Sequence, residues 1–209
     1  MIGRSTFILI GFVEKKMNQQ SLKVIFVGSS SVGKTSLLNA FKGKENSTET
    51  TATISPENVK KTVVNSRNIR IQLDIWDTAG QEKYQAIGAI YYRGADVALL
   101  CYDFENRNDI NKWIDRILEV TPNCIIVLVI TKKDELSDDQ IDEMETIADN
   151  IIKVQNNVKM CFVTSALKKY KVDELFGYVA DCEADHNSTA TIKDINTKGQ
   201  KKKDDGCCG

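Results

Sequence analysis

The amino-acid sequence predicts an α/β fold in which a six-stranded, mostly parallel sheet carries helices on both faces. Apolar, β-branched runs recur along the chain, and helix-like stretches separate most of them. Strands that alternate with helices in this way pair in parallel and are covered on both faces. The expected strands are residues 22–27, 59–64, 69–76, 96–102, 124–130 and 160–163. The expected helices are residues 34–41, 81–92, 109–120, 137–154 and 172–185.

Four of these elements carry further local signals. The strands at 59–64 and 69–76 are separated only by residues 65–68 (Asn-Ser-Arg-Asn), which predicts a hairpin and therefore one antiparallel edge. The fourth expected helix follows Ser137, which fits an N-cap, and Gln140 occupies the capping-box position. The third expected helix shows part of an amphipathic period at Asp109, Trp113 and Leu118.

Composition excludes several classes of function. The chain has 209 residues, with 28 Lys and Arg against 29 Asp and Glu, so its net charge of −1 argues against nucleic-acid binding through bulk charge. The sequence contains one histidine, His186, which nearly excludes histidine-centred catalysis and metal sites built from several histidines. Six cysteines are too few for a disulfide scaffold, and Cys101, Cys124 and Cys161 lie in apolar runs that predict buried thiols. A reducing, cytosolic compartment fits this pattern.

The chain divides into three segments. Residues 1–20 form an N-terminal extension, expected to be disordered, whose apolar run at 7–13 is far shorter than the ~20 residues that span a bilayer. Met17 offers a second candidate start. One folded domain is expected at 21–186, because roughly 150 residues make a typical domain. The tail at 187–209 is poor in aromatic residues and is expected to be flexible.

Residues 28–35 (GSSSVGKT) match the pattern G-x-x-x-x-G-K-[ST] between an expected strand and an expected helix. In such a loop, backbone N–H groups at a helix N-terminus bind phosphate oxygens. Lys34 can reach the β- and γ-phosphates, and the Thr35 hydroxyl suits Mg²⁺. A chance Gly/Ser turn is the alternative, but it does not explain strand, spacing and helix together. The residues expected to contact nucleotide here are Ser30, Ser31, Val32, Gly33, Lys34, Thr35 and Ser36.

A second loop, residues 77–81 (DTAGQ), follows the expected strand that ends at Trp76. Asp77 should lie at the same sheet edge as the phosphate loop, where a carboxylate can hold Mg²⁺. Gly80 offers a backbone N–H to the γ-phosphate, and Gln81 can orient the attacking water, which makes it the candidate catalytic residue. The alternative is a simple turn that closes a strand. The two loops do not by themselves decide between ATP and GTP.

The segments GSSSVGKTS at 28–36, WDTAGQEKY at 76–84 and YYRGA at 91–95 resemble the Rab family of the Ras superfamily of small GTPases. The resemblance covers about residues 22–181 and the extreme C-terminus. It implies the G domain of the P-loop NTPases, which binds GTP or GDP with Mg²⁺ and hydrolyses GTP slowly. It also implies that a threonine of the first switch loop binds Mg²⁺ and the γ-phosphate, and Thr53 aligns best with that position.

Residues 131–134 (TKKD) resemble the guanine-binding motif N-K-x-D. A carboxylate at Asp134 accepts from both donors of guanine, whereas adenine would leave it unsatisfied. The stem of Lys132 can cover the base. Thr131 replaces the usual Asn but keeps a polar donor, so we expect a modest effect on affinity. The resemblance of residues 164–167 to the family's S-A-K segment adds the candidate base contacts Ser165, Ala166 (through its backbone N–H) and Leu167.

The first switch loop, within residues 42–58, departs from the family pattern. Ser55 stands where the family has glycine, and the chain has no aromatic residue between Phe41 and Tyr84 except Trp76. The usual aromatic cap over the guanine is therefore missing. Weaker nucleotide retention and unusual effector choice follow as hypotheses.

The chain ends in Gly206-Cys207-Cys208-Gly209, which is not the C-a-a-X signal. Adjacent Cys207 and Cys208 near a Rab-like terminus resemble the double-geranylgeranyl signal. Two lipid chains anchor a protein stably, whereas one anchors it marginally. The alternative is a solvated tail with unmodified thiols.

The resemblance implies a monomeric, membrane-attached switch in vesicle trafficking, held by its prenyl groups on the cytoplasmic face of an endomembrane and cycling with the cytosol. Its expected partners are an exchange factor, a GTPase-activating protein, a GDP-dissociation inhibitor, a prenylation escort and effectors, with no nucleic acid. Two alternatives stay open. One is an atypical guanine-nucleotide-binding scaffold with little hydrolysis or cycling, suggested by the altered switch loop. The other is an ATPase or kinase of the phosphate-loop class, against which Asp134 argues.

Overall fold

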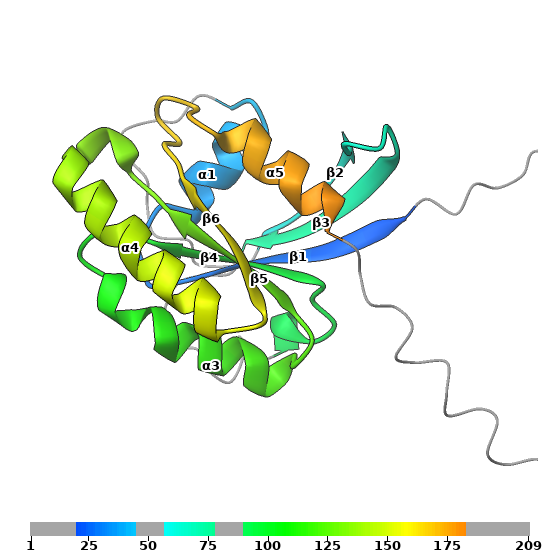
Figure 1. Cartoon of the computed structure of the whole chain (residues 1–209). Coiled ribbons are helices and arrows are strands. Elements are labelled where there is room, and N and C mark those ends of the chain that lie inside the picture. Colours follow the sequence, from blue (N-terminus) through cyan, green and yellow to red (C-terminus); the bar gives the residue numbers. More distant parts are fainter. Residues whose placement is uncertain (1–19, 45–56, 78–89, 183–209) are drawn as a thin grey trace, which may run out of the picture.

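A computed structural model of the chain describes residues 20–44, 57–77 and 90–182. Six strands form one sheet in the order β2-β3-β1-β4-β5-β6 (Figure 1). Every neighbouring pair is parallel except β2 and β3, so the predicted mostly parallel, six-stranded α/β fold is confirmed. The strands are β1 (Ser21–Val27), β2 (Glu57–Val64), β3 (Arg70–Asp77), β4 (Val97–Tyr102), β5 (Ile125–Ile130) and β6 (Val158–Val163).

Helices cover both faces of the sheet (Figure 1). Buried side chains of α1 (Lys34–Phe41) and α5 (Val172–Asp181) share one apolar core, in which the rings of Phe41 and Phe176 stack with centroids 3.5 Å apart. Buried side chains of α3 (Ile110–Val120) and α4 (Asp138–Val154) share the core on the opposite face. No helix within the described ranges is long and apolar enough to cross a membrane.

Burial explains why the sequences of the central strands are continuous apolar runs. All six residues of β4 are buried, because helices cover it on both faces. The outer strand β2 instead alternates exposed and partly buried residues, as expected for an edge strand. Cys101 and Cys124 are buried as predicted, and burial raises the pKa of each thiol to about 12. Cys161 is only partly buried, because β6 forms the other edge of the sheet.

The predicted hairpin is confirmed in the antiparallel pairing of β2 with β3, in which Val64 faces Arg70. The side chain of Asn65 closes the turn, since its Oδ1 accepts hydrogen bonds from the backbone N–H groups of Arg67 and Ile69 at 3.1 and 2.9 Å. Asn68 takes the left-handed conformation that the turn requires, with φ of 59°.

The predicted capping box at the start of α4 is confirmed, because Ser137 and Gln140 exchange side-chain to backbone hydrogen bonds.

The predicted end of the last helix at residue 185 is wrong. Helix α5 ends at Asp181, and Cys182 is extended. Its buried apolar face stops at Ala180, and Oδ1 of Asp181 accepts hydrogen bonds from the N–H and hydroxyl of Ser66 in the hairpin turn. Of the expected helix at 81–92, only residues 90–92 are described, and they are helical.

Candidate functional site

The carboxyl ends of the parallel strands meet at one edge of the sheet, which is where ligands bind in open α/β proteins. The phosphate loop follows β1, and Asp77 is the last residue of β3. Residues 131–134 follow β5, and residues 164–167 follow β6. The fold therefore gathers four separate sequence segments at a single edge.

The backbone of the phosphate loop depends on its two glycines. Gly28 has φ of 137°, and a Cβ there would lie 2.1 Å from the carbonyl oxygen of Cys101 in β4. Gly33 has φ of 96° and is the N-cap of α1. Any larger side chain at Gly28 would push the loop off the sheet, so the glycine permits both the turn and the close approach.

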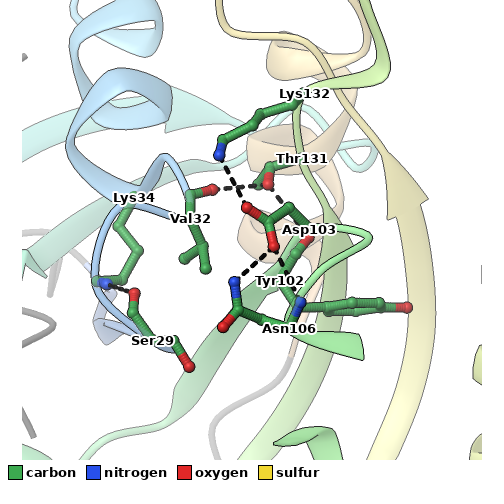
Figure 2. Close-up of polar contacts among 8 residues, drawn as sticks. All are labelled: Ser29, Val32, Lys34, Tyr102, Asp103, Asn106, Thr131 and Lys132. Carbon is green, nitrogen blue, oxygen red and sulfur yellow. Dashed lines mark hydrogen bonds and ion pairs between the residues drawn. The ribbon is translucent and has the colours of Figure 1, made fainter. Parts of the chain in front are cut away.

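Lys34 is 5% exposed, and its ammonium is held by its own loop. Nζ donates a 2.9 Å hydrogen bond to the carbonyl oxygen of Gly28. It also donates a 2.6 Å hydrogen bond to the carbonyl oxygen of Ser29 (Figure 2). A buried ammonium needs such partners, because desolvation of an isolated charge is costly. The loop thus fixes a positive charge beside the helix N-terminus, where phosphate oxygens are favoured.

Asp77 is fully buried and faces the phosphate loop. Its Oδ2 accepts a 2.6 Å hydrogen bond from the hydroxyl of Thr35, while Oδ1 has no hydrogen-bond partner among the described residues. Burial raises the pKa of Asp77, and the bond from Thr35 and the charge of Lys34 offset only part of that rise. A buried carboxylate oxygen without a donor is a ready ligand for a hard cation. The pair Thr35 and Asp77 therefore fits Mg²⁺, which prefers oxygen ligands.

The backbone conformation of Ser31 in the phosphate loop was not predicted from the sequence. It is exposed and has φ of 63°, a left-handed conformation that disfavours residues with a Cβ. Strain of this kind costs about 1–3 kcal/mol and persists where surrounding structure enforces it. Glycine would adopt this conformation freely.

Thr131 joins the guanine-type loop to the phosphate loop. It is 4% exposed, and its hydroxyl donates to the carbonyl oxygen of Val32 at 2.6 Å; the carbonyl of Tyr102 lies at 3.1 Å (Figure 2). The sequence predicted that threonine would keep a polar donor at this position. The structure adds its acceptors, which connect β4, β5 and the phosphate loop.

Lys132 is held by a residue that the sequence analysis missed. Its Nζ lies 2.8 Å from Oδ2 of Asp103, which is 6% exposed. Oδ1 of Asp103 accepts from the backbone and side-chain N–H groups of Asn106 at 3.1 and 2.6 Å (Figure 2). Burial alone would raise the pKa of Asp103, but hydrogen bonds from Lys132 and Asn106 hold it below the ordinary value. Its position in the sequence could have identified Asp103, because it directly follows β4 and therefore lies at the same edge of the sheet as the other site residues.

Asp134 is exposed, and the hydroxyl of buried Ser165 donates a hydrogen bond to its Oδ1. Ser165 also accepts from the backbone N–H of Lys168 at 3.0 Å, so one serine links the two predicted base-binding segments. Ala166 is partly buried, and Leu167 is 55% exposed. These contacts place the predicted base-reading groups side by side at the surface.

The described residues thus bring together four of the predicted segments, the last through the bond between Ser165 and Asp134. The bond between Thr35 and Asp77 joins the phosphate loop to the end of β3, and the bond between Thr131 and Val32 joins it to the base loop. The remaining predicted site residues lie outside the described residues. They are Thr53, Gly80, Gln81, Cys207 and Cys208.

The sheet is mostly parallel, and its glycine-containing loop carries a buried lysine beside an aspartate that ends a strand. These features define a phosphate-loop nucleotide-binding protein. A family model described as "Ras family" matches residues 23–183. The Ras-related protein RabQ of Dictyostelium discoideum is 34% identical over 88% of this chain and 90% of the relative. The GTP-binding protein yptV5 of Volvox carteri is 34% identical over 90% and 96%, and Rab7 of Drosophila melanogaster is 36% identical over 76% and 78%.

The chain therefore belongs to the Ras family, among its Rab small GTPases. Members of this family bind GTP and GDP and hydrolyse GTP, so the protein is a GTP-hydrolysing enzyme. The reading as an ATPase or kinase is accordingly not supported.

Proposed function

We propose that this protein is a membrane-attached molecular switch of vesicle trafficking that binds GTP and GDP with Mg²⁺ and hydrolyses GTP slowly. The observation that carries the proposal is the grouping of buried Lys34 and Asp77 with partly buried Thr35, which places an ammonium, a hydroxyl and an unpartnered carboxylate oxygen at one loop. Such a set matches a phosphate chain with its metal ion better than any uncharged ligand.

In this proposal the phosphates lie in the loop at residues 28–35, and the backbone N–H groups of Ser30 to Ser36 bind their oxygens. Lys34 contributes a fixed positive charge that needs no rearrangement on binding. Thr35 and Asp77 would hold Mg²⁺, which neutralises charge on the β- and γ-phosphates when it is bound.

The segments at 131–134 and 164–167 select the base. The Asp134 carboxylate accepts hydrogen bonds from the ring N–H and exocyclic amine of guanine, and Ser165 orients that carboxylate. The stem of Lys132 covers the base while Asp103 holds its ammonium, and the backbone N–H of Ala166 binds the guanine carbonyl. Leu167 replaces the family's lysine beside the base.

The two loops around Thr53 and Gly80 distinguish the GTP state from the GDP state, a role that rests on the family resemblance. Thr53 would join Thr35 and Asp77 in holding Mg²⁺ in the GTP state, and Gln81 would orient the attacking water. Loss of the γ-phosphate releases both loops, and partners that prefer one arrangement read the bound nucleotide. The partners are an exchange factor, a GTPase-activating protein, a GDP-dissociation inhibitor with a prenylation escort, and effectors.

The folded domain spans residues 21–186 in this proposal, between an extension at 1–20 and a flexible tail at 187–209 that ends in the lipidation signal. Prenyl groups on Cys207 and Cys208 attach the protein to the cytoplasmic face of an endomembrane. Mass spectrometry of the C-terminal peptide from membrane fractions tests this step. Two prenyl groups support it, and unmodified cysteines in that fraction contradict it.

The nucleotide carried by purified protein tests the central claim. We expect denaturation to release GDP or GTP at close to one molecule per chain, with ATP and ADP absent. Single-turnover GTP hydrolysis with and without cell extract then separates a cycling switch from the scaffold that the altered first switch loop suggests. Hydrolysis that extract does not accelerate supports the scaffold, and bound adenine nucleotide contradicts both.

A further inference from the structure

Helix α3 contacts the phosphate loop through a buried tryptophan. The indole N–H of Trp113 donates a hydrogen bond to the hydroxyl oxygen of Ser29, with the nitrogen and oxygen 3.3 Å apart. Trp113 is 9% exposed and Ser29 is 5% exposed, so water has little access to this bond. The two residues lie 84 positions apart in the sequence. Tryptophan has only an N–H donor, so the contact has one direction.

Ser29 also contacts the lysine of the phosphate loop. Its backbone carbonyl accepts the 2.6 Å hydrogen bond from Nζ of Lys34, which is the shorter of the two carbonyl contacts to that ammonium. Two hydrogen bonds therefore meet on Ser29: its hydroxyl oxygen accepts from the Trp113 indole, and its backbone carbonyl accepts from the Lys34 ammonium. A shift of Ser29 changes the position of the charge that the phosphates would meet.

The indole itself is fixed from two sides. Trp113 packs in the core that α3 shares with α4 and the sheet, beside buried Ile114 and Ile117 of its own helix. The guanidinium of Arg116 lies over the indole ring, 4.9 Å from the centroid, where a cation is attracted to the ring face. Because close-packed cores resist displacement, the indole N–H holds a fixed position beside Ser29.

We propose that Trp113 is a positioning residue for nucleotide binding, which holds Ser29 and through it the Lys34 ammonium in the phosphate-binding arrangement. The proposal rests on the nucleotide site proposed above and adds a residue from α3 to it. Its consequence is that α3 is coupled to the rate of nucleotide release. A residue that served only to fill the core would affect the stability of the fold and leave release unchanged.

Two single variants and their combination separate these roles. Trp113→Phe keeps a ring but removes the donor, and Ser29→Ala removes the acceptor and leaves a buried indole N–H unpaired. We expect each single variant to release GDP about 2- to 10-fold faster than the parent, the range for one net hydrogen bond. The double variant should release GDP no faster than the faster single variant, because both break the same connection.

Stability should fall for different reasons in the two single variants. Ser29→Ala should lower thermal stability because it leaves a buried indole N–H unpaired, whereas Trp113→Phe should lower it because the smaller ring leaves a cavity in the core. Ile114→Val is the matched control, since it removes a buried methyl group from the same helix without touching the loop. It should lower stability and leave GDP release within about 1.5-fold of the parent. Equal release from all variants, with stability alone reduced, would overturn the proposal.

The indole N–H also gives a direct spectroscopic signature. The chain has two tryptophans, so ¹⁵N-labelled protein shows two indole N–H signals, which Trp76→Phe assigns. Ser29→Ala should shift the Trp113 proton signal upfield as the hydrogen bond is lost, and an unmoved signal contradicts the contact. Lys34→Met is measured alongside. If parent and Lys34→Met both fail to bind GDP, the nucleotide site itself is wrong; if only Lys34→Met fails, the site stands and the Trp113 variants decide the inference.

Discussion

The phosphate half and the base half of the site are built differently. Lys34 and Asp77 lie buried against the sheet; loop carbonyls accept hydrogen bonds from the Lys34 ammonium, whose charge offsets only part of the effect of burial on Asp77. Asp134 and Leu167 instead lie exposed at the surface. Interactions between buried charges are strong because they are poorly screened, whereas surface pairs contribute little. If the proposed site is right, we expect the phosphate half to supply most of the affinity and the base half to supply selectivity.

The largest expected effect is on affinity and falls in the phosphate half. Lys34→Met removes charge-assisted hydrogen bonds to phosphate, and we expect GDP affinity to fall about 1,000-fold. Lys112→Met is the matched control, because Lys112 is an exposed lysine on α3, and it should bind GDP as the parent does. Titration with a fluorescent GDP analogue measures both. A loss of less than 10-fold for Lys34→Met would place the phosphates elsewhere.

A smaller effect, on selectivity, is expected in the base half. Asp134→Asn replaces an acceptor by an amide that can donate to the extra carbonyl of xanthine. We expect the preference between GDP and xanthosine diphosphate to move about 100-fold toward xanthine, since unmatched polar groups discriminate strongly. Competition binding measures the ratio, with Glu135→Gln on the same short helix, Lys133–Glu135, as the control. An unchanged ratio in Asp134→Asn would show that this carboxylate does not contact the base.

The buried carboxylate of the phosphate half predicts a pH dependence. Because the pKa of Asp77 is raised on folding, its contribution to stability is complete below the ordinary value of 3.8 and is lost as pH rises through the folded value. We expect Asp77→Asn to increase the free energy of unfolding of metal-free and nucleotide-free protein by about 1–3 kcal/mol at pH 7. The gain should shrink toward pH 4.

Urea denaturation across this pH range measures the effect, and Asp115→Asn, at an exposed position of α3, is the control. The same Asp77→Asn protein should lose the Mg²⁺ dependence of its GDP affinity. A variant that is less stable than the parent at pH 7 would contradict the interpretation of Asp77 as an uncompensated metal ligand.

The smallest expected effect concerns the exposed tip of the phosphate loop. Ser31→Gly relieves the left-handed backbone but adds freedom to the unfolded chain, so we expect a net gain of only about 0.5 kcal/mol. Ser30→Gly is the matched control, since Ser30 is exposed beside it without a positive φ, and it should lower stability. Thermal unfolding of the nucleotide-free protein compares the two. A loss at Ser31 as large as that at Ser30 would show that the left-handed conformation carries no strain.

The regions also differ in how far the sequence could predict them. The alternation of apolar runs and the hairpin turn were predictable because hydrophobic periodicity and turn residues act locally. The strand–loop–helix form of residues 21–41 was predictable for the same reason, since Gly28, Gly33 and Lys34 lie within one short segment. The end of α5 was not, because the contact of Asp181 with Ser66 joins residues 115 positions apart.

The sequence by itself determined the fold class, the family resemblance and the chemistry of the two nucleotide-binding segments, because each depends on residue type and short spacing. Only the tertiary structure decided which groups hold those segments in place. The ion pair of Lys132 with Asp103, the bond of Thr131 to Val32 and the bond of Trp113 to Ser29 all connect different strands, helices or loops. Such contacts arise when the sheet brings distant strand ends together, and no periodicity or motif along the chain encodes which partners will meet.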